Sequence, residues 1–94
     1  MTTKRVIVWT SVFKRDFKRE KKTDVQLESV LNTILQALAD DSPLAAKYRD
    51  HALTGNWKDH RDCHVKPDLV LIYRKPDTET LLLVRLGSHS ELGI

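Results

Sequence analysis

Two nearly continuous apolar segments, Leu69–Arg74 and Thr80–Leu86, constrain the fold of this chain more than any other feature. The intervening Lys75-Pro76-Asp77 is typical of a turn, because proline fixes φ and offers no N–H to a ladder of hydrogen bonds. Strands that are apolar on both faces lie in the interior of a sheet. The sequence therefore predicts two central strands, which need further strands beside them and other elements over them.

A helical stripe in the N-terminal half predicts part of that cover. Thr23 and Gln26 have the spacing of a capping box, which would begin a helix here. A shorter helix is expected before it, with Ser11 as its N-cap and with Phe13 and Phe17 on one face. The stripe of the longer helix recurs every three or four residues, which is the helical period. It consists of Leu27, Leu31, Ile34, Leu35 and Leu38.

Two further segments complete the predicted sheet. Arg5–Thr10 is rich in β-branched and apolar residues, and Trp57–Val65 alternates enough to form a strand. Lys66-Pro67-Asp68 would connect this strand to the next as a hairpin. The predicted fold is α+β in the order β-α-α-β-β-β, with two N-terminal helices packed on a mainly antiparallel four-stranded sheet. A chain of 94 residues suits one domain, so we assign residues 1–94 to a single domain.

The composition indicates a globular protein and narrows its class. Hydrophobic residues make up 40% of the chain and charged residues 31%, which is ordinary for a folded domain. Cys63 is the only cysteine, so the chain forms no internal disulfide and nothing indicates secretion. No segment approaches the roughly 20 apolar residues that span a membrane. We therefore expect a cytoplasmic protein with no membrane partner.

Basic residues are concentrated in one segment. The formal net charge is only +3, but the run from Lys14 to Lys22 holds six basic and two acidic residues. Such a run is typical of a solvated helix face. It also suits contact with the phosphate backbone of a nucleic acid. The candidate RNA-binding residues of this run are Lys14, Lys18, Lys21 and Lys22.

The four histidines, His51, His60, His64 and His89, all lie in the C-terminal half. His60, Cys63 and His64 form an H-x-x-C-H pattern, but this spacing matches no standard zinc site, and on a strand Cys63 would point away from both histidines. Cys63 also lacks the helix N-terminus that would lower its pKa for nucleophilic catalysis. We therefore expect neither a metal nor a cofactor, and interpret Cys63 as a packed residue.

The histidines suit a third chemistry, the general acid–base cleavage of RNA. That reaction needs a base for the 2′-OH, cations for the phosphorane and an acid for the leaving 5′-oxygen. Imidazole, with an unperturbed pKa of roughly 6.5, serves as either acid or base, and arginine suits the phosphate. The candidate catalytic residues are His51, His64, Asp68 and His89. The candidate phosphate-binding arginines are Arg61, Arg74 and Arg85.

These residues belong to a longer pattern that resembles a known family. The chain contains D-H-x-L-x-G-x-W-K-x-x-R-D-x-H-V-x-P-D, then two apolar strands and a G-S-H-S-E-L tail. This pattern is similar to the YafQ branch of the RelE/ParE toxin superfamily, and the resemblance covers nearly the whole chain. It implies a small RelE-like fold and a ribosome-dependent, metal-independent endoribonuclease that cuts messenger RNA in the ribosomal A site. It also implies a toxin–antitoxin system in which a cognate antitoxin neutralises this chain.

The resemblance assigns roles by position. It implies that His89 is the general acid, and that His51, His64 and Asp68 share proton abstraction and substrate orientation. The family pattern has an aromatic residue four positions after the last histidine, where a ring would stack on a base, but this chain has Gly93. Gly93 thus gives some weight to an attenuated toxin-like module.

Another alternative is a member of the superfamily that binds a different target, such as DNA gyrase, without cutting RNA. The set of histidines favours the nuclease, because a gyrase poison does not need it. For the nuclease we expect an acidic or amphipathic antitoxin that wraps the basic surface by coupled folding. By resemblance, two toxins and two antitoxins form a heterotetramer.

Overall fold

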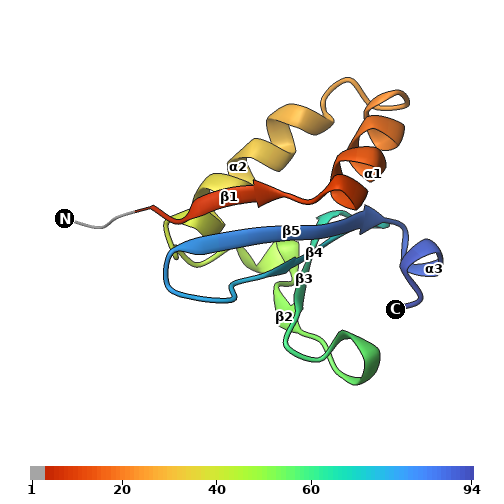
Figure 1. Cartoon of the computed structure of the whole chain (residues 1–94). Helices are drawn as coiled ribbons and strands as arrows, with labels where there is room; N and C mark the ends of the chain where they lie inside the picture. The colour runs from red at the N-terminus through yellow and green to blue at the C-terminus, as the bar shows by residue number, and fades with distance from the viewer. Residues whose placement is uncertain (1–3) are drawn as a thin grey trace.

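The computed structural model describes residues 4–94 and contains a five-stranded sheet with three α-helices (Figure 1). The helices and strands, in chain order, are β1 (Val6–Trp9), α1 (Ser11–Lys21), α2 (Leu27–Ala39), β2 (His51–Ala52), β3 (Arg61–Lys66), β4 (Leu69–Arg74), β5 (Thr80–Gly87) and α3 (His89–Leu92). Two 3-10 helices, η1 (Ala46–Tyr48) and η2 (Gly55–Trp57), flank β2. In this described part of the chain, no helix is long and apolar enough to cross a membrane.

The strand order is β1-β5-β4-β3-β2. The α+β class and the two N-terminal helices are as predicted, and β4, which is apolar on both faces, is the central strand. The four-stranded sheet in the order β-α-α-β-β-β is wrong in detail. The two-residue strand β2 adds a fifth strand beside β3, and β1 is parallel to β5, which makes the sheet mixed. A strand of two residues is too short to show any alternation in the sequence.

Local geometry explains three further differences from the prediction, two through hydrogen bonds and one through a glycine. Thr10, not Ser11, caps α1, because its Oγ1 accepts from the N–H of Phe13 at 3.2 Å and donates to the carbonyl of Leu83 at 2.7 Å. No capping box begins α2, since Thr23 Oγ1 donates back into α1.

The third difference concerns β3, which begins at Arg61 and not at Trp57. The residues before it form η2, and Gly55 opens that turn with a φ of +66°. A left-handed φ is accessible to glycine at little cost, so this residue interrupts an extended segment.

The sheet separates two apolar clusters, one on each face. The larger cluster lies under α1 and α2, which cover one face of the sheet in Figure 1. The smaller cluster lies on the opposite face, where α3 and η2 pack. Its members are Val70, Ile72 and Leu92, with Leu53, Trp57, Val84 and Ile94 partly buried beside them.

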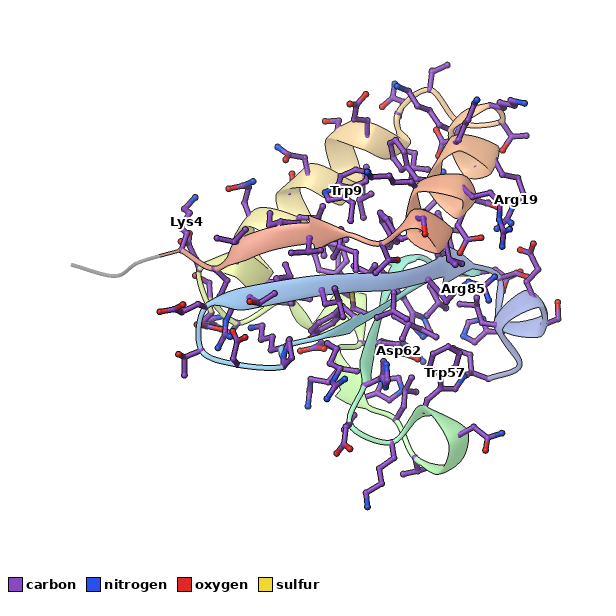
Figure 2. All side chains as sticks on the ribbon, in the orientation of Figure 1. Lys4, Trp9, Arg19, Trp57, Asp62 and Arg85 are labelled. Atoms are coloured by element: carbon purple, nitrogen blue, oxygen red, sulfur yellow. The ribbon has the colours of Figure 1, made fainter. Side chains whose placement is uncertain are left out.

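The alternation of β3 decides which side chains reach the smaller face. Cys63 and Val65 belong to the large cluster under the helices, so Cys63 is a packed residue, as expected. Asp62 and His64 therefore lie on the opposite face. Figure 2 shows Asp62 on the side of the sheet away from α1 and α2.

Candidate active site

Three histidines from separate elements converge on the face of the sheet opposite α1 and α2. His51 is the first residue of β2, His64 lies on β3, and His89 is the first residue of α3. The ring centroids of His51 and His64 are 6.4 Å apart, and those of His64 and His89 are 4.9 Å apart. The structure thus brings together three of the four predicted catalytic residues, and His64 lies between the other two.

Asp68, the fourth predicted catalytic residue, holds His89. It lies in the turn between β3 and β4, and its Oδ1 is 2.9 Å from Nδ1 of His89 and 3.4 Å from the backbone nitrogen of the same residue. These hydrogen bonds from His89 lower the pKa of Asp68, so its carboxyl is ionised at neutral pH. Because a carboxylate can only accept a hydrogen bond, Nδ1 of His89 carries the proton that bonds Asp68. The other ring nitrogen, Nε2, is not engaged by Asp68 and is available for proton transfer.

His64 is half-buried between its two histidine neighbours. Burial lowers the pKa of His64, because it disfavours the charged imidazolium, and the nearby His89 lowers it further. His64 is therefore neutral at physiological pH. A neutral imidazole can accept a proton, which is what a general base must do.

Asp62 is a buried carboxyl beneath the histidines, and the sequence analysis did not identify it. Its side chain is almost fully buried, and its Oδ1 lies 3.1 Å from Nδ1 of His51 without making a hydrogen bond. That nitrogen donates instead to the carbonyl of Arg49, at 2.7 Å. Burial raises the pKa of Asp62, although His51 and His64 oppose the shift. The available signal was its position two residues before His64, on the same face of the strand.

A groove of about 870 Å³ opens beside the histidines. His64 and His89 form part of its wall, and three basic residues line it as well: Lys47, Arg49 and Lys66. Lys66 is paired with Asp24, whereas Arg49 is exposed and lies close enough to His64 to lower its pKa. Lys47 and Arg49 were not among the predicted phosphate ligands, although they closely precede His51 in the sequence.

The predicted arginines lie away from this groove. Arg85 is bound to the buried carboxyl of Asp16, with Nε 2.7 Å from Oδ2. Arg61 is paired with Asp50 at 3.4 Å. Arg74 ends β4, at the opposite end of that strand from the histidines, since His64 pairs with Val70 near the start of β4. Their contact with phosphate stays a prediction.

The predicted lysines all lie on or just after α1, and their side chains are exposed. Lys21 is paired with Glu28 on α2 at 3.2 Å. None of the four lysines lines the groove beside His64 and His89. A contact of α1 with RNA would therefore be separate from the histidine site.

The residues of the H-x-x-C-H pattern do not lie together in the structure. Across residues 4–94, no group of three or more histidine, cysteine, aspartate or glutamate side chains is arranged to hold a metal ion. Cys63 lies on the helix side of the sheet, away from His64, and burial raises the pKa of its thiol. His60 precedes β3 and packs against Trp57, with ring centroids 5.3 Å apart.

Comparison with known proteins places this chain in a family. Residues 5–93 match the family model of YafQ, described as a bacterial toxin of type II toxin–antitoxin systems. A curated relative, the mRNA interferase toxin YafQ of Escherichia coli K12, is 34% identical over 88 residues, covering 94% of this chain and 95% of the relative. The chain belongs to the YafQ toxin family.

Solved structures of YafQ-like toxins share the fold. A metal-bound toxin from Helicobacter pylori is 46% identical, with a TM-score of 0.85 over 96% of this chain and 99% of that one. YafQ in the Escherichia coli DinJ–YafQ complex is 38% identical, with a TM-score of 0.76 over 94% of this chain and 97% of that one. The prediction of a YafQ-like toxin is confirmed. That of an endoribonuclease agrees with the name of the Escherichia coli relative.

Gly93 lies at the position where the sequence analysis expected an aromatic ring. It ends α3 with a φ of +71°, and a Cβ atom built there would have no neighbour within 4 Å. Leu92 cannot substitute for the ring, because it is buried in the smaller apolar cluster, and Ile94 packs partly against the same cluster. In the described part of the chain, α3 and the two residues after it therefore present no phenylalanine, tyrosine or tryptophan ring to the site.

Proposed function

We propose that this YafQ-family toxin is a ribosome-dependent endoribonuclease that cuts messenger RNA in the ribosomal A site, by acid–base chemistry that needs no metal ion. The observation that carries the proposal is the packing of His64 against the Asp68–His89 pair, with imidazole centroids 4.9 Å apart. One imidazole is positioned to accept a proton, and the other is oriented to deliver one. The name mRNA interferase, carried by the Escherichia coli relative, supports RNA as the substrate.

Different histidines act as the general base and the general acid. His64, neutral because burial lowers its pKa, takes the proton of the 2′-OH, and the 2′-oxygen then attacks phosphorus. His89 acts in its imidazolium form, in which Nδ1–H is bonded to Asp68 and Nε2 carries the second proton. It gives the proton from Nε2 to the departing 5′-oxygen and is left neutral. The products are a 2′,3′-cyclic phosphate and a free 5′-OH. His51 assists His64 in orienting the 2′-OH.

Cations around the groove suit the negative charge that develops on the phosphorane. Arg49 and Lys47 line the same groove as His64 and His89, so they are better placed than the predicted arginines to contact the scissile phosphate. The exposed lysines of α1 and its C-terminus would contact ribosomal RNA through its backbone.

An antitoxin partner follows from the family. The family model describes toxins of type II toxin–antitoxin systems, and YafQ of Escherichia coli has been solved in complex with the antitoxin DinJ. We expect a cognate antitoxin with an acidic or amphipathic segment, which would complement the basic groove and helix of this chain. A heterotetramer of two toxins and two antitoxins, acting in the cytoplasm, completes the proposal.

Primer extension on a messenger RNA with purified ribosomes tests the proposal. The wild-type chain should cut within codons only when ribosomes are present, with and without a chelator that binds transition metals and leaves the Mg²⁺ of the ribosome in place. His89→Ala should slow cleavage by about 10²-fold or more, because the general acid is lost. His60→Ala is the matched control, since His60 lies outside the groove and should leave the cutting rate unchanged.

The possible results separate the alternatives. Ribosome-independent cutting, or cutting abolished by a chelator that spares the Mg²⁺ of the ribosome, would contradict the proposed mechanism. An absence of cutting, with growth inhibition retained, would favour a toxin that binds another target. Equal losses in His89→Ala and His60→Ala would show that the acid lies elsewhere.

A further inference from the structure

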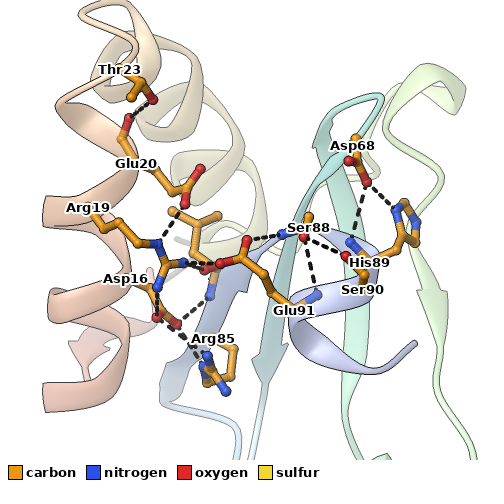
Figure 3. Close-up of polar contacts among 11 residues, drawn as sticks. Asp16, Arg19, Glu20, Thr23, Asp68, Arg85, Ser88, His89, Ser90 and Glu91 are labelled. Carbon is orange, nitrogen blue, oxygen red and sulfur yellow. Dashed lines mark hydrogen bonds and ion pairs between the residues drawn. The ribbon is translucent and has the colours of Figure 1, made fainter.

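Arg19 connects α1 to the end of β5 and to α3 (Figure 3). Its Nη1 is 3.1 Å from Oδ1 of Asp16, and its Nη2 donates to the carbonyl of Leu86 at 3.0 Å and lies 3.5 Å from Oε2 of Glu91. Its Nε donates to Glu20 at 2.9 Å. All three nitrogens of the guanidinium are therefore engaged, which fixes the orientation of the side chain.

The inner end of this connection is rigid. Asp16 is 0% exposed, and its Oδ2 accepts from Nε of Arg85 at 2.7 Å and from the backbone nitrogen of Leu86 at 3.0 Å. A carboxylate with several charge-assisted partners in the protein interior has little freedom to move. On one side Arg19 is thus bound to Asp16 and to the C-terminal end of β5, and on the other side it contacts Glu91.

The outer end of the connection is the first turn of α3. Glu91 and Ser88 form a capping box: Glu91 Oε1 accepts from the nitrogen of Ser88 at 3.0 Å, and Ser88 Oγ accepts from the nitrogen of Glu91 at 3.2 Å. The second carboxylate oxygen of Glu91 faces Arg19. His89 directly follows Ser88. The ion pair between Arg19 and Glu91 therefore stabilises the helical turn that carries the imidazole of His89.

Gly87 leaves the space in which these groups meet. A Cβ atom at this position would lie 3.3 Å from Oε1 of Glu91 and 3.5 Å from Nη2 of Arg19. A side chain at Gly87 would therefore require the carboxylate of Glu91 to shift by a few tenths of an ångström. Glycine at this position leaves room for Arg19 and Glu91 to approach each other.

A helix of four residues does not hold its shape on its own. From one side Asp68 binds the ring and the backbone nitrogen of His89, and from the other Arg19 holds the capping glutamate. We infer that Arg19 is a positioning residue, which fixes α3 through Glu91 so that the imidazole of His89 stays in place against His64. This inference rests on the proposed role of His89, and it separates Arg19 from the exposed lysines around it.

Imidazole NMR tests the positioning without requiring the reaction. In ¹⁵N-labelled wild-type protein, His89 should show one tautomer, protonated on Nδ1. In Arg19→Gln its signals should broaden or report a mixture of tautomers. Arg5→Gln is the matched control, because Arg5 also clamps a carboxylate and backbone carbonyls, in contact with Asp41, Asp77 and Thr80 and not with the α3 cap. Unchanged His89 signals in Arg19→Gln would overturn the inference.

Kinetics on programmed ribosomes test the consequence. Misplacing a reacting group by about 1 Å costs up to about 10²-fold, so Arg19→Gln should lower kcat by about 10- to 100-fold, with KM within about twofold of wild type. A change in KM alone would mean that Arg19 binds RNA and would overturn the inference. An equal loss of kcat in Arg5→Gln, with both variants folded by circular dichroism, would also overturn it.

Glu91→Gln provides a second variant if Arg19→Gln does not fold. Glutamine keeps the capping interaction with Ser88 but loses the ion pair with Arg19. It should lower kcat in the same direction with KM unchanged, and an unchanged kcat would overturn the inference. If the wild-type chain cuts no RNA, the proposed function fails, and the NMR comparison still decides the role of Arg19.

Discussion

His64 and His89 meet edge to face, with ring centroids 4.9 Å apart and ring planes at 73°. His64 lies on β3, and His89 begins α3, which follows β5 in the chain. In the sheet, β4 lies between β3 and β5. Two imidazoles at this distance do not both carry a charge without cost, so protonation of one disfavours protonation of the other. The pair is thus suited to divide the roles of base and acid.

The first prediction concerns the pH dependence of cleavage. Burial and the proximity of His89 lower the pKa of His64, so its basic form persists below the ordinary histidine value of about 6.5. The cleavage rate should therefore rise with pH along a limb centred below that value. Single-turnover rates across the acidic range, together with NMR titration of His64, would measure it. A limb centred above the ordinary value would exclude His64 as the base.

The second prediction concerns the buried carboxyl of Asp62. Burial raises its folded-state pKa, so the stability that it contributes is complete at acidic pH and is lost as pH rises through that raised value. Asp62→Asn should therefore stabilise the protein by about 1 kcal/mol at neutral pH, and the gain should shrink on acidification.

Urea unfolding at neutral and acidic pH measures the effect of Asp62→Asn, and Asp59→Asn at an exposed position is the control. Because Asp62 Oδ1 lies 3.1 Å from His51 Nδ1, the same variant should cleave RNA more slowly. A variant that is both less stable and fully active would contradict this account.

The third prediction concerns Asp16. Burial alone would raise its pKa, but the hydrogen bonds from Arg85 and the backbone of Leu86 more than offset it, so the pKa is lowered. The carboxyl therefore contributes stability above its unfolded value of about 3.8, and this contribution is lost as pH falls through the lower folded value. Asp16→Ala leaves Arg85 without its partner and should cost about 3–5 kcal/mol.

Chemical denaturation measures the free energy of unfolding that Asp16→Ala and Glu28→Gln each lose. The comparison shows how much more a buried ion pair contributes than an exposed one. Glu28 pairs with Lys21 on the surface, where such a pair is worth at most about 1 kcal/mol. Similar small losses in both variants would show that Asp16 contributes no more than a surface carboxylate.

Much of the fold followed from the sequence because long periodic segments carry a strong signal. The apolar stripe of α2 and the apolar strands β4 and β5 are each several residues long, and the structure has all three. The parallel pairing of β1 with β5 could not be predicted, since it joins segments that are far apart in the chain and leaves no local pattern.

The candidate site shows the opposite case. Its residues were named from the resemblance and from residue type, but two of the elements that hold them were missed. His51 lies in a strand of two residues, and His89 begins a helix of four. Both elements are too short to produce a recognisable hydrophobic period in the sequence. The long-range partners of two arginines could not be predicted either. Arg85 binds Asp16 on α1, and Arg19 contacts the carbonyl of Leu86 and the carboxylate of Glu91, and only the tertiary fold brings these groups together.

The last prediction concerns Gly93, where the family pattern has an aromatic residue. Its φ of +71° disfavours any other side chain by about 1–2 kcal/mol, but the space around it is open. Gly93→Phe and Gly93→Ala should lose similar amounts of stability in urea unfolding, because both bear the same backbone strain. Only Gly93→Phe can stack on a base, which is worth about 1–3 kcal/mol, so it alone should lower KM for programmed ribosomes by about fivefold or more. If the two variants bind ribosomes equally, position 93 does not contact the RNA base, and the chain does not lack binding energy there.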